Sequence, residues 1–92
     1  MAGVSNPTGG VPFEKVLPSL CAAEAALANG DPERLGAMIE VLSRSLGFTV
    51  AIAAQGHGPT IDEMLGGAND YAHAEAVDKA PFARMMSRGL GR

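Results

Sequence analysis

The stretch LGFTVAIAAQGHGPTIDE, residues 46–63, decides the fold, because its apolar first half fits three different structures. Phe48, Val50 and Ile52 alternate with smaller residues, as in a β-strand. A strand needs a partner, and no other segment has a convincing strand pattern. The apolar run is also about half the roughly 20 residues that span a bilayer. A helix satisfies its own backbone hydrogen bonds, so we expect one continuous helix over residues 31–55, with a strand over residues 48–54 as the alternative.

The second half of the stretch contains a turn and a helix start. Gly56 and Gly58 flank His57 and are followed by Pro59, a composition typical of a turn. Thr60 and Glu63 then have the spacing of a capping box, which predicts a helix beginning at Thr60. We expect this helix to run to about residue 79 and Pro81 to end it. Residues 81–92 would then form a short final helix with a frayed end.

The segments before residue 46 predict two further helix boundaries. Asp31 is a suitable N-cap and Pro32 suits a first helical position. Asn29 and Gly30 are suited to end a preceding helix, because both tolerate the left-handed conformation. Pro18 interrupts the apolar pattern of that helix, so we expect a kink or a short turn over residues 13–17 and the main helix from Pro18.

These boundaries predict an all-α fold. The connection between the first two helices is about two residues long, which forces them to be antiparallel neighbours. We therefore expect an antiparallel helical hairpin, a third helix packed on it and a short C-terminal helix. We divide the chain into a flexible N-terminal tail (residues 1–11), a single helical domain (12–86) and a basic C-terminal tail (87–92).

The composition bounds the class of protein. The chain has 92 residues, of which 47% are hydrophobic but only 4% aromatic, and its net charge is −3. An Ala-rich core of this kind is thin, and thin cores often gain from oligomerisation. The acidic balance argues against a nucleic-acid partner. The single Cys21 excludes an internal disulfide and fits a reducing compartment, so we expect a cytoplasmic protein without a membrane span.

One cluster could carry metal chemistry. Glu63, Asp70 and His73 fall on one face of the third expected helix. An acid three residues before a histidine is a ligand spacing found in di-iron helical bundles. This face points away from the apolar positions, however, whereas bundle ligands project inward. We therefore expect a solvated polar face, no metal and no other cofactor.

No catalytic constellation is present in the sequence. His57 has the features of an exposed turn residue, and Cys21 lies on an apolar helix face, with no residue nearby in sequence that would activate its thiol. We therefore expect no enzymatic activity. The basic end of the chain carries Arg84, Arg88 and Arg92 at four-residue spacing, which could dock on an acidic surface.

We expect a non-enzymatic interaction or assembly subunit that buries an apolar helical segment against copies of itself or a larger protein complex. The expected interface residues are Leu46, Phe48, Val50, Ile52, Phe82, Met85 and Met86. One alternative is a metal- or ligand-binding helical bundle formed on dimerisation. Another is a small regulator that docks through its basic C-terminal tail.

Overall fold

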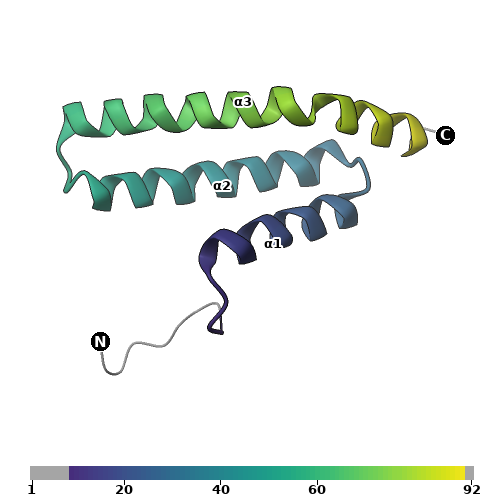
Figure 1. Ribbon diagram of the computed structural model, residues 1–92, viewed down its shortest axis with the longest axis horizontal. Coiled ribbons are helices and arrows are strands. Elements are labelled where there is room, and N and C mark those ends of the chain that lie inside the picture. Colours follow the sequence, from purple (N-terminus) through teal and green to yellow (C-terminus); the bar gives the residue numbers. More distant parts are fainter. Residues whose placement is uncertain (1–8, 91–92) are drawn as a thin grey trace. The chain divides into compact units, whose positions relative to one another are not determined.

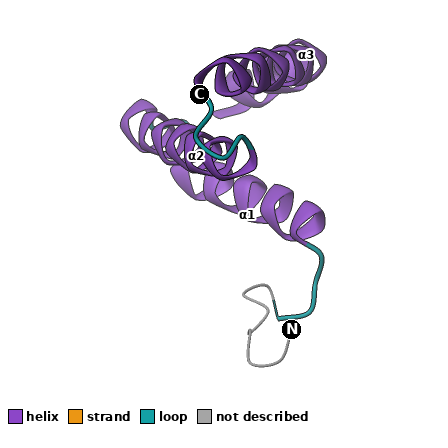
Figure 2. Cartoon of the chain, turned by 90° about the vertical axis from the view of Figure 1, so that its left-hand side faces the viewer, coloured by secondary structure: helices purple, strands orange, loops and turns teal. Residues whose placement is uncertain are grey.

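The computed structural model describes residues 9–90, with side chains for residues 9–86, and this part of the chain is all-helical (Figures 1 and 2). Its elements are α1 (Phe13–Ala28), α2 (Pro32–Ala53) and α3 (Gly58–Leu90). The strand alternative is wrong, since residues 48–53 belong to α2 and the Ala54 amide donates to the Val50 carbonyl at 2.8 Å. A helix pairs these amides within one segment, which a lone strand could not do. Most of the expected N-terminal tail, residues 1–8, lies outside the described residues.

The chain divides into two compact units, Met1–Leu35 and Gly36–Arg92, hereafter the first and the second unit. The boundary falls one turn into α2, so this helix belongs to both units. The prediction of a single domain over residues 12–86 requires the two units to pack together, and it stays a prediction.

In the first unit, α1 runs continuously through Pro18. The expected start at Pro18 is therefore wrong. The helix begins earlier because the Pro12 carbonyl accepts hydrogen bonds from the amides of Lys15 and Val16, at 3.0 and 3.1 Å. Pro18 lies in the second turn and removes only one backbone donor there. The Ser19 hydroxyl donates to the Lys15 carbonyl at 3.1 Å.

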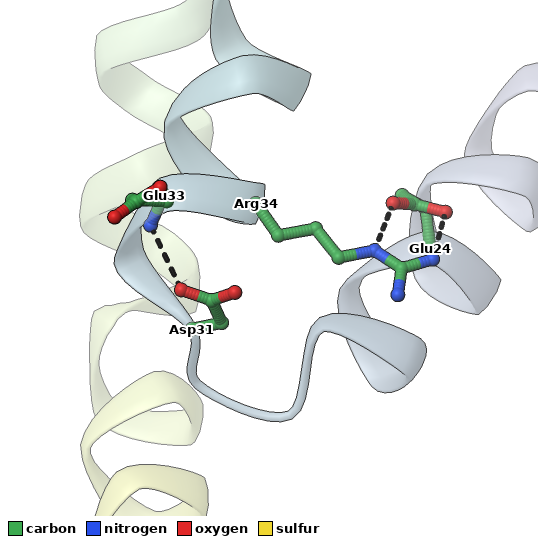
Figure 3. Close-up of polar contacts among 4 residues, drawn as sticks. All are labelled: Glu24, Asp31, Glu33 and Arg34. Atoms are coloured by element: carbon green, nitrogen blue, oxygen red, sulfur yellow. Dashed lines mark hydrogen bonds and ion pairs between the residues drawn. The ribbon is translucent and has the colours of Figure 1, made fainter.

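The turn between α1 and α2 has the predicted chemistry. Asn29 and Gly30 both have positive φ, 50° and 83°, and they end α1. The Asp31 carboxylate accepts a hydrogen bond from the Glu33 amide at 3.1 Å (Figure 3), and Pro32 is the first residue of α2. Both the left-handed stop and the Asp31 cap are therefore confirmed.

In the second unit, α2 and α3 run antiparallel and are joined by a short turn (Figure 1). The Gln55 amide donates to the Ile52 carbonyl, and the Gly56 amide donates to the Ala51 carbonyl, at 3.1 and 3.0 Å. This pair of bonds is the Schellman motif, with Gln55 in the left-handed conformation at φ 52°. The motif satisfies the last carbonyls of α2 and reverses the chain.

The start of α3 differs from the prediction. The helix begins at Gly58, and the Ile61 amide donates to the His57 carbonyl at 2.9 Å. His57 is therefore the capping residue, while Thr60 lies inside the first turn, and the predicted capping box at Thr60 is wrong. Pro59 causes no break, because an amide in the first helical turn has no partner within the helix in any case.

The end of α3 also differs from the prediction. Pro81 lies inside α3, and the helix continues to Leu90, so the expected separate C-terminal helix is wrong. Pro81 removes one backbone hydrogen bond. Residues 83–86, Ala-Arg-Met-Met, all have high helix propensity and continue the helix beyond it.

Burial is slight throughout the described residues. The buried side chains are Ala28 in the first unit, and Val50 and Ala54 in the second unit. No large side chain among them is fully buried. Val50 and Ala54 lie one helical turn apart, next to the turn into α3, so the core of the second unit is at the closed end of its hairpin.

Candidate interaction surface

Many large apolar side chains are exposed on the surface of the described residues. Sixteen large hydrophobic side chains are exposed there, from Val11 to Met86, whereas only three apolar side chains are buried, two of them alanine. Scattered apolar residues are normal on any protein surface, but a contiguous apolar patch marks an interaction site. These side chains therefore indicate an interaction site only where several of them lie on one face.

One such gathering is a strip along α2, formed by Val41, Phe48 and Ile52 and hereafter called the α2 strip. Their exposed fractions are 62%, 69% and 62%. At about 100° per residue, the three positions lie within about 40° of one another around the helix. Val50, which is only 6% exposed, points about 160° or more away from each of them. The strip is thus on the side of α2 opposite its buried contacts.

The structure separates the expected interface residues into three groups. Phe48, Ile52 and Leu46 are exposed on α2, while Val50 is buried inside the second unit. Phe82, Met85 and Met86 are exposed near the end of α3. In the antiparallel hairpin, this end of α3 is remote from the turn beside which Ile52 lies (Figure 1). The two exposed groups therefore form separate surfaces.

The expected basic contact is only partly described. Arg84 is exposed on α3, whereas the side chains of Arg88 and Arg92 lie outside the described residues. The neighbouring Lys79 is already paired, since its ammonium lies 2.9 Å from Glu75 and 2.8 Å from Asp78. The hydrogen bond from Lys79 lowers the pKa of Asp78, and its two carboxylate partners raise the pKa of Lys79.

The candidate metal residues do not form a site. Glu63, Asp70 and His73 are all exposed. Among the described residues, no group of three His, Cys, Asp or Glu side chains is arranged to hold a metal ion. All three residues lie more than about 100° around α3 from Ile61, a half-buried residue at the closed end of the hairpin.

The two candidate reactive side chains have structural surroundings. The exposed His57 ring has its Nδ1 2.8 Å from the Thr60 hydroxyl, which ties the turn to the first turn of α3. Cys21 is a half-buried free thiol on α1.

The first unit contains a polar contact that no pattern in the sequence predicts. The Arg34 guanidinium donates two hydrogen bonds to the Glu24 carboxylate, with N–O distances of 2.6 and 3.1 Å (Figure 3). These bonds lower the pKa of Glu24 and raise the pKa of Arg34. The two residues are ten positions apart, so only the prediction of a tight turn after α1 could have brought them together. In the second unit, Glu40 and Arg44 form an ion pair at 2.9 Å, with the four-residue spacing that favours such pairs on a helix.

By length and composition, α2 is apolar enough to cross a membrane, and within the described residues it is the one helix of which this is true. Core helices of soluble proteins and signal sequences meet the same criterion. The apolarity of α2 therefore does not by itself identify a membrane span.

Comparison with known proteins gives no relative from which a role could be taken. No protein family, no curated protein and no solved structure matches this chain. The functional argument therefore depends on the exposed surface.

Proposed function

We propose that this protein is a non-enzymatic assembly subunit that buries the α2 strip against a protein surface. The observation that carries the proposal is the exposure of Val41, Phe48 and Ile52 on a helix whose opposite side holds the buried Val50. Leu46 is also exposed, on a different side of the same helix. The cytoplasm is the compartment we propose, since the chain has a single free cysteine.

The distribution of burial supports this proposal energetically. Fully burying a Val, Ile or Phe side chain contributes about 1.5–3 kcal/mol. Two of the three buried residues are alanines, which contribute less, while sixteen larger apolar side chains are exposed. A partner surface that covered the α2 strip would therefore add hydrophobic stabilisation that the isolated chain lacks.

The arrangement of the helices is part of the proposal. We propose that α1, α2 and α3 form a hairpin with a further helix packed on it, as the short connections favour. The apolar side chains Phe13, Leu20 and Leu27 of α1 are also exposed. Packing of the helices on one another and contact with a partner would therefore both bury exposed apolar side chains.

The proposal predicts that stability depends on concentration. When only the associated form buries the α2 strip, association shifts the folding equilibrium, and the melting temperature rises with protein concentration. Thermal unfolding followed by circular dichroism, together with light scattering over a concentration series, measures both properties. A compact monomer that unfolds cooperatively, with a melting temperature independent of concentration, would contradict the proposal.

The other functions considered have less support. Glu63, Asp70 and His73 do not converge in the described residues, and Lys79 at the basic end is already engaged by two carboxylates. We therefore propose neither metal binding nor docking through the C-terminal tail.

A further inference from the structure

We infer that the α2 strip binds the same strip of a second copy of this chain, with the two α2 helices antiparallel about a two-fold axis. This inference rests on the proposed function and names its partner. It follows from the spacing, the side-chain sizes and the charges of α2.

The spacing of the strip is that of a coiled-coil seam. Val41, Ser45, Phe48 and Ile52 follow one another at intervals of four, three and four residues. Alternating intervals of three and four keep side chains on one side of a helix and allow knobs-into-holes packing with a second helix. The other side of α2 holds the buried Val50, so the seam is free of the packing within the second unit.

The order of the intervals is the same in both directions along the chain. In an antiparallel pair centred between residues 46 and 47, Val41 lies level with Ile52 of the second copy. Phe48 then lies level with Ser45 of the second copy, which places the largest side chain of the seam opposite the smallest. A parallel pair would instead place the two Phe48 rings opposite each other and leave space beside both Ser45 residues. The sizes therefore favour the antiparallel pair, in which large and small side chains interdigitate.

The charges of α2 allow this contact. The four seam residues carry no charge, and the nearby Arg44 is already paired with Glu40 at 2.9 Å. Burial of the seam therefore leaves no carboxylate or guanidinium without a partner. The antiparallel arrangement also places the two helix dipoles side by side in opposite directions, which is favourable.

The size of the strip predicts a weak association. Its three large side chains would bury roughly 100 Å² each, so six of them supply about 600 Å², well below the 1,200–2,000 Å² of a standard interface. We expect a monomer–dimer equilibrium at micromolar or higher concentrations.

Cross-linking of matched cysteine variants tests the geometry. In the full-length chain with Cys21→Ser, we would prepare Ser45→Cys and Phe48→Cys separately, label one isotopically and treat them with a short bismaleimide. The antiparallel seam predicts that the mixture cross-links more than either variant alone. In a mixed dimer, Cys at position 45 of one copy lies level with Cys at position 48 of the other copy. The second pair of positions in that dimer keeps its native Phe48–Ser45 contact. Self-linking of each variant without preference for the mixture would indicate a parallel pair and overturn the inference.

Sedimentation equilibrium of a matched pair of charge variants tests the surface. Val41 and Val77 have similar exposure, 62% and 60%, but only Val41 is in the seam. Val41→Glu should weaken dimerisation at least about tenfold, because an unpaired carboxylate resists burial, while Val77→Glu should leave it unchanged. Equal effects of the two variants would overturn the inference.

The inference and the proposed function can fail separately. Concentration-dependent stability without the mixed cross-link would overturn the antiparallel seam but leave the assembly role standing. A chain that stays monomeric and unfolds without cooperativity would exclude the second copy and leave a different protein as the partner. A compact, cooperative monomer would overturn both.

Discussion

The Glu24–Arg34 pair is the residue-scale feature that links two elements of the first unit. Glu24 belongs to α1 and Arg34 to the first turn of α2, so their two hydrogen bonds close the turn between them. A planar guanidinium matches both oxygens of a carboxylate, which gives the contact a defined geometry. Both side chains are partly exposed to solvent, so we assign the pair an orienting role rather than a large share of stability.

This pair predicts a pH dependence. The pKa of Glu24 is lowered below its usual value of 4.5 by the hydrogen bonds from Arg34. The stabilisation is therefore present above about pH 4.5 and is lost as the pH falls through the lower pKa of the folded state. A carbon-detected NMR titration should find the Glu24 pKa below 4.5, and Arg34→Met should raise it. Arg44→Met, which breaks the separate Glu40–Arg44 pair, should not change it. Equal pKa values of Glu24 with and without Arg34 would contradict this prediction.

Local residue chemistry was predictable where it acts within a few positions. The stop at Asn29 and Gly30, the Asp31 cap and the Glu40–Arg44 pair all depend on neighbours at most four residues away. The Glu24–Arg34 pair depends on the path of a whole turn. The predicted cap of α3 at Thr60 was wrong for a different reason. A helix can begin just before Pro59, so His57 rather than Thr60 is the capping residue.

At the scale of elements, both internal prolines are accommodated within helices, and the turns are made by left-handed residues. Pro18 and Pro81 each cost one backbone hydrogen bond, and α1 and α3 continue through them. Sequence patterns overestimate such breaks, because a proline is a local penalty while helix formation is cooperative over many residues. The apolar run of residues 48–53 was correctly expected in a helix, because no second strand was available to pair with it.

The turn between α2 and α3 predicts opposite effects for two glycine substitutions. Gly56 has φ 76°, which disfavours any residue with a Cβ, so Gly56→Ala should destabilise the second unit by about 1 kcal/mol. Gly66 lies inside α3 with open space around it, so Gly66→Ala should stabilise the helix by about 0.5–1 kcal/mol. Urea unfolding followed by circular dichroism at one fixed concentration compares them. A loss of stability in both variants would show that glycine at position 66 has a role beyond backbone freedom.

At the scale of the whole chain, burial divides the two sides of α2. Helical periodicity placed Val50 and the α2 strip on one helix, but it could not say which side the rest of the chain would cover. Residues 46–54 are apolar on nearly all sides, so the pattern had no single direction. The structure shows which side of α2 faces the rest of the second unit, because Val50 and Ala54 are buried and Phe48 and Ile52 are exposed.

Substitutions of two valines of α2, one buried and one exposed, test whether only one side of this helix is packed. Val50→Ala removes buried methyl groups and should destabilise the dilute chain by about 1–2 kcal/mol. Val41→Ala changes an exposed residue and should alter the stability of the dilute chain by less than about 0.5 kcal/mol. Urea unfolding at a concentration too low for association measures both values. A larger effect at Val41 would mean that the α2 strip is already covered in the free chain.

The scarcity of buried side chains has a consequence for how this sequence can change over time. In most proteins the interior restrains substitution most strongly, because nearly every core position must keep its volume. Here only Ala28, Val50 and Ala54 impose that restraint among the described residues. Most other positions need only to remain compatible with a helix or a turn. We therefore expect the sequence to diverge quickly inside the helices, with the strongest restraint on its divergence at the α2 strip, the surface that we propose contacts another molecule.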